Sequence, residues 1–165
     1  MNPKVLIGYE FSGIVRDAFI KIGIPAISCD IIPTESPGPH IQADITTIDI
    51  SKYLLVIAHP PCTYLCVSGN RYYNNSTERL KALEGIKQIM NWNTPRLCIE
   101  NPVGVISTQI KKPTQIIQPY EYGHLESKRT CLWLKNLPLL IPTNILVDDD
   151  IEPIVHHMSG KNRSK

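Results

Sequence analysis

A cysteine follows two prolines directly after an apolar run in the first half of the chain. Residues 54–58 are predicted to form a buried β-strand, and His59-Pro60-Pro61-Cys62 comes next. Two prolines end a strand and stiffen the loop behind it, so the Cys62 thiol is held at a defined position. A thiolate attacks a carbon of an electron-poor ring once a neighbouring cation or helix N-terminus lowers its pKa. We therefore predict that Cys62 is a nucleophile.

A carboxylic acid stands in the corresponding place after a later strand. Residues 96–99 are predicted to be a strand, and Glu100-Asn101-Pro102 follows it. Glu100 can project into the same crevice as Cys62 and act as a general acid toward a ring nitrogen. Taken alone, the segment also fits a capped turn in which Asn101 and Pro102 serve only the backbone.

Two groups of cationic side chains are candidates for holding a nucleotide. Lys128 and Arg129 come just before a strand predicted at residues 131–134, where they can contact phosphate or polarise a base. Arg71, followed by two tyrosines in the loop after Cys62, can add a phosphate contact and stacking. A solvated strand edge and ordinary loop packing explain the same residues without a ligand.

Acids after the early strands suit a nucleoside cofactor. Glu10, Asp30 and Asp44 follow apolar runs, and carboxylates accept hydrogen bonds from ribose hydroxyls or an amino group. Each acid taken singly is also common in loops and at helix starts. The first turn, Phe11-Ser12-Gly13, is not the GxGxxG of dinucleotide folds, so an uncharged adenosine-type cofactor fits better than a phosphate-anchored one.

The same cysteine also allows a hydrolase interpretation. His59 lies three residues before Cys62 and can serve as its base. No Asn or Asp is evidently placed to orient that imidazole, so we rank this interpretation below attack on a ring. Cys29, Cys98 and Cys131 fit buried apolar positions instead.

Alternating strands and helices must position these groups. Strands are predicted at residues 5–9, 25–29, 54–58, 96–99, 115–117 and 131–134. A first helix, capped by Ser12 and stopped at Gly23, carries Ile14, Val15, Ala18, Phe19 and Ile22 at helical spacing. A second, capped by Ser76, spans residues 77–92 and carries Leu80, Leu83, Ile86, Ile89 and Met90 on one face. The alternation predicts a single α/β domain with a mostly parallel, doubly wound sheet, whose ligands bind beyond the carboxyl ends of the strands.

Composition agrees with one globular domain in a reducing compartment. The 165 residues include five cysteines and no CxxC pair, which indicates neither a disulfide framework nor a zinc site. The formal charge of +2 neither requires nor excludes nucleic acid. Because no signal peptide or membrane-length apolar run is present, we expect a soluble, cytoplasmic protein.

Taken in order, these residues resemble the motifs of cytosine carbon-5 DNA methyltransferases. Phe11-Ser12-Gly13 is similar to the first cofactor motif, Pro60-Pro61-Cys62 to the catalytic Pro-Cys motif, and Glu100-Asn101 to the glutamate motif. The segment from Tyr122 to Arg129 is similar to the later Gln-x-Arg-x-Arg motif, from which Ser127 and Lys128 depart. The fuller stretches 59–65, 69–71 and 100–104 resemble short methyltransferase-like proteins common in bacteriophages and their hosts.

The resemblance implies a Rossmann-like domain that uses S-adenosylmethionine to methylate carbon 5 of cytosine through a covalent Cys62 adduct. Its implied residues are catalytic Cys62, Glu100 and Arg129; cofactor-binding Glu10, Phe11, Ser12, Gly13, Asp30, Asp44 and Pro60; and substrate-binding Asn101, Arg71 and Lys128. No metal is implied. A non-catalytic nucleotide- or DNA-binding protein of the same fold is the alternative.

The resemblance also implies what this chain lacks. We expect residues 1–147 to form the catalytic domain without a target-recognition region, which reading a sequence through the major groove requires. The partner is therefore loosely specified DNA, a single strand or a free cytosine nucleotide. Residues 148–165 are expected to be a polar segment, disordered or truncated before a final cofactor-side helix. The sequence makes no prediction of the oligomeric state.

Overall fold

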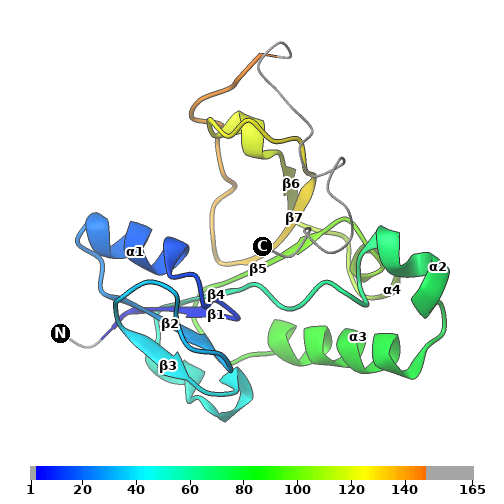
Figure 1. Ribbon diagram of the computed structural model, residues 1–165, viewed down its shortest axis with the longest axis horizontal. Helices are drawn as coiled ribbons and strands as arrows, with labels where there is room; N and C mark the ends of the chain where they lie inside the picture. Colours follow the sequence, from blue (N-terminus) through cyan, green and yellow to red (C-terminus); the bar gives the residue numbers. More distant parts are fainter. Residues whose placement is uncertain (1–2, 148–165) are drawn as a thin grey trace.

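Seven strands form one sheet in the computed structural model, which describes residues 3–147 (Figure 1). The spatial order is β3-β2-β1-β4-β5-β7-β6. The strands are β1 Val5–Gly8, β2 Ala26–Asp30, β3 His40–Gln42, β4 Leu55–Ala58, β5 Leu97–Pro102, β6 Gln115–Ile117 and β7 Thr130–Lys135. The predicted strands are confirmed, and the polar segment predicted at 148–165 lies outside the described residues.

The first five strands run parallel, as predicted. β1 is central and pairs with β2 on one side and β4 on the other, with Val5 opposite both Ala26 and Leu55. β2 pairs with β3, and β4 with β5, in the same direction. The last two strands differ, because β7 is antiparallel to both β5 and β6. The sheet is therefore mostly parallel, in a mixed α/β fold compatible with a Rossmann-like arrangement.

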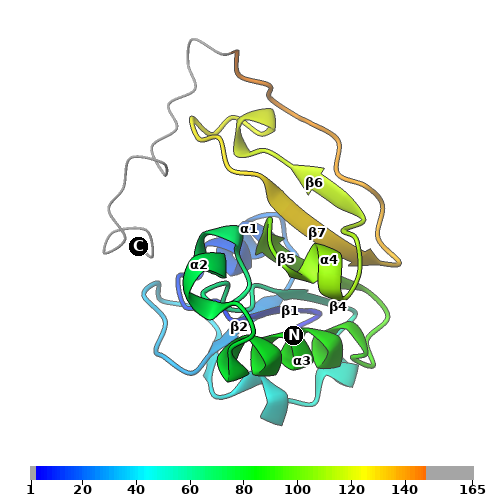
Figure 2. The same cartoon turned by 90° about the vertical axis from the view of Figure 1, so that its right-hand side faces the viewer.

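Helices cover both faces of the sheet. On one face Val5 and Ile7 pack with Val15 and Phe19 of α1 (Ile14–Lys21). Leu6 points the opposite way, and the core on its side includes Leu83, Ile86 and Ile89 of α3 (Thr77–Met90). Two four-residue helices, α2 (Asn70–Tyr73) and α4 (Ile106–Gln109), complete the connections. Figures 1 and 2 show α1 and α3 on opposite sides of the strands.

Helix α1 forms where the apolar spacing predicts it, but its cap and its buried side chain differ from the prediction. Gly13, in the left-handed region at φ 77°, is the N-cap, while the Ser12 hydroxyl only accepts from the Ile14 amide at 3.3 Å. Ile14 and Ile22 are 73% and 69% exposed, and Ala18 is also exposed. Only part of the apolar stripe of α1 therefore reaches the core.

The buried side chain of α1 is Arg16, which is 0% exposed. Its guanidinium bonds Asp17 Oδ1 at 2.8 Å, Ser28 Oγ of β2 at 3.2 Å and the Ser36 carbonyl at 3.1 Å. Hydrogen bonds from Arg16 and then Ser36 lower the pKa of the Asp17 carboxyl. A Cβ added to Gly38 would meet the same guanidinium. Arg16 thus ties α1 and β2 to the loop that follows β2.

Helix α3 begins as predicted. The Ser76 hydroxyl accepts from the Arg79 amide at 3.2 Å, which satisfies one of the free donors of the first turn. Leu83, Ile86 and Ile89 are buried, but Leu80 is 61% exposed, so the predicted apolar face is one residue too wide. Within residues 3–147 no helix is long and apolar enough to cross a membrane.

Candidate functional site

The carboxyl ends of β1 and β4 lie side by side at the point where the strand order of the sheet reverses. The connection after β1 leads to β2 on one side, whereas β4 lies on the other, and such a switch point opens a crevice. Tyr9 leaves β1 in the left-handed conformation at φ 59°. The His59 amide donates to the Gly8 carbonyl at 3.0 Å, which fixes the start of the Pro-Pro-Cys loop against β1.

A tight turn holds Cys62 in this loop. The Cys62 carbonyl accepts from the amides of Leu65 and Cys66, both at 2.9 Å. Leu65 is buried, whereas Cys62 and Cys66 are only half-buried. The turn therefore anchors one side chain in the core and leaves two thiols at the surface of the crevice.

Two buried polar side chains donate hydrogen bonds to backbone carbonyls of this loop. Asn101 of β5 is 1% exposed, and its Nδ2 donates to the Pro60 carbonyl at 2.8 Å. Arg79, in the first turn of α3, is 2% exposed and donates through Nε to the Tyr64 carbonyl at 2.8 Å. The predicted substrate-binding Asn101 is thus placed beneath the loop, where it positions Pro60, itself predicted to touch the cofactor.

A glycine allows β5 to approach the same turn. Gly104 forms an isolated antiparallel bridge with Cys66, and the Val105 amide donates to the Leu65 carbonyl at 2.8 Å. A Cβ on Gly104 would collide with the Leu65 carbonyl oxygen. The turn that follows Cys62 and the segment after Glu100 are therefore in direct backbone contact.

Cys62 faces a cavity of about 580 Å³ that it shares with the predicted cations Lys128 and Arg129, whereas Glu100 does not line it. Its lining includes Cys62, Cys66, Ser68, Lys128 and Arg129. Lys128 and Arg129 reach this edge because β7 is antiparallel, with Thr130 opposite Pro102 at the end of β5. A strand running the other way would have carried these cations to the far edge of the sheet.

Opposing influences act on the Cys62 thiol. Burial, then the neighbouring Cys66 thiol, and more weakly Glu100, raise its pKa, whereas Lys128 lowers it. The thiol is therefore protonated near neutral pH in the free protein, and a stronger positive influence would be needed to form the thiolate. Lys128 is placed to supply part of that influence.

Glu100 pairs with a histidine. It lies within β5 opposite Leu132 of β7, rather than after the strand as predicted. Its Oε2 is 3.2 Å from Nδ1 of His59, and both side chains are about a quarter exposed. This is half of the arrangement that a cysteine hydrolase needs. The other half is absent among residues 3–147, since His59 Nε2 is buried without a hydrogen-bond partner and Cys62 makes no bond to it.

Glu10, predicted to bind a cofactor, accepts hydrogen bonds from the first turn of helix α1. It is 5% exposed, and its two carboxylate oxygens accept from the Val15 amide at 2.6 Å and the Arg16 amide at 3.3 Å. With Ser12 bonded to Ile14, the free amides at the start of α1 are engaged by the protein itself. The helix end is therefore not open to a phosphate.

Two further acids lie at the ends of β2 and β3. Asp30 Oδ1 accepts from the Ile32 amide at 3.2 Å, and Asp44 Oδ1 accepts from the amide and hydroxyl of Thr46. Tyr9 lies near both carboxylates. Burial raises the pKa of its phenol most, and Asp44, Cys29 and Asp30 raise it further. The structure thus brings Asp30, Asp44 and Tyr9 together, and Tyr9 is a residue that sequence reasoning missed.

Two cavities adjoin Tyr9 on this side of the loop. One, of about 310 Å³, is lined by the predicted Glu10, Phe11 and Ser12, together with His59. The other, of about 410 Å³, lies between Tyr9, Pro60 and Pro61 and one side of α3. Gly13, the N-cap of α1, adjoins the first of these. All seven predicted cofactor residues therefore lie at the carboxyl edge of the first four strands.

Arg71 is placed outside these cavities. It lies in α2, is exposed, and does not line the cavity that holds Cys62. Its predicted contact with substrate stays a prediction. Among residues 3–147 no group of three or more His, Cys, Asp or Glu side chains is arranged to hold a metal.

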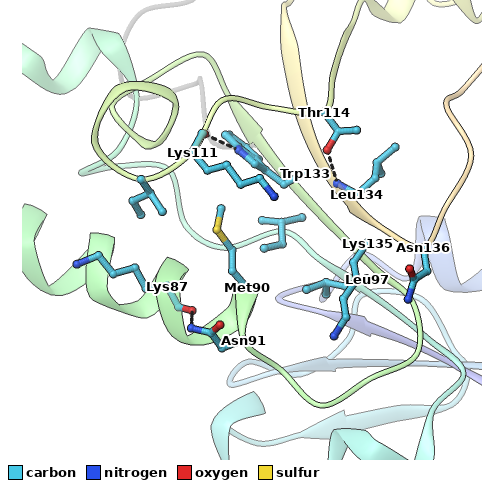
Figure 3. A pocket seen from close by; sticks show the side chains of 12 residues that line it. Lys87, Met90, Asn91, Leu97, Lys111, Thr114, Trp133, Leu134, Lys135 and Asn136 are labelled. Carbon is cyan, nitrogen blue, oxygen red and sulfur yellow. Dashed lines mark hydrogen bonds between the residues drawn. The ribbon is translucent and has the colours of Figure 1, made fainter.

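Another cavity, of about 630 Å³, opens at the amino end of β5, away from Cys62 (Figure 3). Met90, Leu97 and Trp133 form its apolar floor, and Lys87, Lys111 and Lys135 stand around it. None of the predicted site residues lines it.

Comparison of the sequence with models of known protein families and with curated proteins found no match.

Proposed function

We propose that the chain is an S-adenosylmethionine-dependent methyltransferase that acts on carbon 5 of cytosine in DNA or in a cytosine nucleotide. The observation that carries this proposal is the contrast between the two sides of the Pro60–Cys62 loop. Carboxylates follow β1, β2 and β3 on one side, whereas a thiol and two cations line the cavity on the other. The first side suits a cationic cofactor and the second an anionic substrate.

The residues on the acidic side fit S-adenosylmethionine better than a dinucleotide. Tyr9 and Phe11 offer aromatic faces, and the unbonded oxygens of Asp30 and Asp44 can accept from ribose hydroxyls and an amino group. Glu10 already satisfies the first amides of α1, so a pyrophosphate would find no donors there. The strand order also departs from the common dinucleotide-binding order by the antiparallel β7 between β5 and β6.

The chemistry proposed for the protein divides between two strands. The Cys62 thiolate from the loop after β4 forms a bond from Sγ to carbon 6 of the cytosine ring, and the displaced π electrons reach ring nitrogen 3. Glu100 from β5 donates its proton to that nitrogen, which leaves carbon 5 nucleophilic. Bound S-adenosylmethionine supplies an electrophilic sulfonium methyl for carbon 5. Solvent water then accepts the proton from carbon 5, and the electrons of that C–H bond form the C5=C6 double bond and expel the Cys62 thiolate. Ring nitrogen 3 returns its proton to Glu100.

Lys128 and Arg129 are proposed to hold the nucleotide in this chemistry. Both line the cavity beside Cys62, where their charges can pair with a phosphate next to the target base. If the substrate is duplex DNA, the base must leave the stack at a cost of a few kcal/mol.

Transfer of labelled methyl from S-adenosylmethionine tests the proposal. The substrates are duplex DNA, single-stranded DNA and free deoxycytidine nucleotides, and the variants are Cys62→Ser and the matched Cys66→Ser from the same cavity. We expect label on carbon 5 of cytosine with wild type and with Cys66→Ser, and none with Cys62→Ser. An oligonucleotide containing 5-fluorocytosine has no proton to lose at carbon 5, so its adduct with Cys62 should persist in denaturant.

Three outcomes would count against methyl transfer. Nucleotide binding without label on any substrate favours the non-catalytic alternative. No label together with no cofactor binding by calorimetry removes the cofactor from the proposal. Hydrolysis that needs no S-adenosylmethionine and disappears in His59→Ala favours the hydrolase.

A further inference from the structure

His59 and Glu100 form a partly buried pair that joins the loop after β4 to strand β5. Their contact, Nδ1 to Oε2 at 3.2 Å, crosses 41 residues of sequence. The backbone of His59 is fixed independently by the hydrogen bond from its amide to the Gly8 carbonyl and by the two prolines that follow it. The imidazole is therefore a rigid partner for a glutamate side chain that would otherwise sample many rotamers.

The surroundings of the pair determine where its protons reside. His59 Nε2 is buried and has no hydrogen-bond partner among the described residues. A buried N–H without an acceptor is costly, so in the neutral ring the proton lies on Nδ1 rather than Nε2. Nδ1–H then donates to Oε2 of Glu100.

The ionisable groups that lie near the pair include thiols and a carboxylate. The thiols of Cys62, Cys98 and Cys131 all lie within electrostatic reach of Glu100, and Glu10 shares a cavity with His59. Among residues 3–147 the ion-pair partner of Glu100 is His59, and Arg129 makes no ion pair with it.

We propose that His59 is a positioning residue that fixes Oε2 of Glu100, so that the other carboxyl oxygen carries the proton delivered to the substrate ring. The chemistry of this inference rests on the proposed function, but the pair itself does not. In the addition step the proton leaves Glu100 for ring nitrogen 3, and Nδ1–H of His59 stabilises the carboxylate left behind. The proton returns to Glu100 when Cys62 is expelled.

The first test is independent of activity. Long-range ¹H–¹⁵N spectra of labelled protein report which nitrogen of each histidine carries a proton. We expect Nδ1–H for His59, in contrast to His40, whose Nε2 lies 3.1 Å from the Ile32 carbonyl and whose Nδ1 lies 2.9 Å from Ser28 Oγ. In Glu100→Leu the Nδ1–H of His59 loses its acceptor, so its ¹H and ¹⁵N resonances should shift while those of His40 stay unchanged. An Nε2–H tautomer in wild type, or no change in Glu100→Leu, would overturn the pairing.

The second test measures the role of the pair in catalysis. His59→Leu should lower kcat for methyl transfer roughly 10- to 100-fold with little change in the KM for S-adenosylmethionine. His59→Asn retains a side-chain N–H close to the position of Nδ1, so it should recover most of that loss. In the His59→Leu background, Glu100→Gln should cost much less than it does in wild type. The exposed His124→Leu is the control.

The two tests separate the possible failures. Unchanged kcat in His59→Leu, or full additivity with Glu100→Gln, would sink the positioning role even if the wild type is active. A wild type that transfers no methyl removes the proposed function, whereas the tautomer spectra still decide whether the pair exists.

Discussion

Cys62 combines a half-buried position with a neighbouring cation, Lys128, that acts on its thiol. Burial and Cys66 raise its pKa, and Lys128 opposes them. The identity and position of this cysteine follow from the Pro-Pro-Cys pattern at a strand end. Its electrostatic environment does not, because Lys128 arrives from the antiparallel β7, whose direction no local pattern predicts.

Replacing Lys128 with Ala should slow alkylation of Cys62 by iodoacetamide. Removing the cation raises the thiol pKa further, so less thiolate is present at a given pH and the rate profile shifts to higher pH. We expect a roughly two- to fivefold slower rate at pH 8, as for the loss of a partly exposed charge pair. Peptide mapping by mass spectrometry separates Cys62 from the other thiols. Lys112→Ala, exposed beyond α4, should leave the rate unchanged, and an equal rate in both variants would contradict the role of Lys128.

The pairing of His59 with Glu100 lay beyond sequence reasoning for a related reason. The two residues are 41 positions apart, and they meet only because β4 and β5 are neighbours. Glu10 makes a local contact that was not predicted. Its carboxylate turns back onto the amides of α1, which the spacing after β1 allows, and its predicted cofactor contact stays a prediction.

At the scale of elements, the turn that follows Cys62 depends on close backbone packing against the segment just after β5. Gly104 permits this contact, because a Cβ there would strike the Leu65 carbonyl. Gly104→Ala should lower the free energy of unfolding by about 1–3 kcal/mol, the range for overpacking a well-packed site. Denaturant titration followed by circular dichroism measures it.

Gly85 provides the matched control within α3. A Cβ added at Gly85 meets no atom within 4 Å, so Gly85→Ala should stabilise the protein by about 0.5–1 kcal/mol through helix propensity. Equal effects of the two substitutions would mean that contact with the Leu65 carbonyl does not limit residue 104.

Elements with strong local signals were predictable. Ser76 and the apolar spacing after it predicted α3, and β-branched runs predicted the central strands, because burial on both faces leaves little choice of residue type. Helix α1 was predicted with the wrong cap and too wide an apolar face. A glycine N-cap and a buried arginine leave no apolar pattern to detect.

At the scale of the whole molecule, ligand binding should distinguish the proposed cofactor from a dinucleotide. S-adenosylhomocysteine at 100 times its Kd should stabilise the fold by about 2.7 kcal/mol, which raises Tm by roughly 5–10 °C in a domain of this size. NADH should have no comparable effect, because Glu10 occupies the helix end that a pyrophosphate needs. Differential scanning fluorimetry compares the two ligands, and stabilisation by NADH alone would reverse the assignment.

The buried Arg16 has an evolutionary consequence. Its guanidinium supplies the three atoms nearest to a Cβ added at Gly38, so a smaller residue 16 would relieve that clash. Alanine at position 38 should be harmful in this chain and tolerated in a lineage that has already replaced Arg16 with a smaller side chain. The order of the two substitutions therefore matters, and descendants of this sequence should reach an alanine at 38 only through a prior change in helix α1.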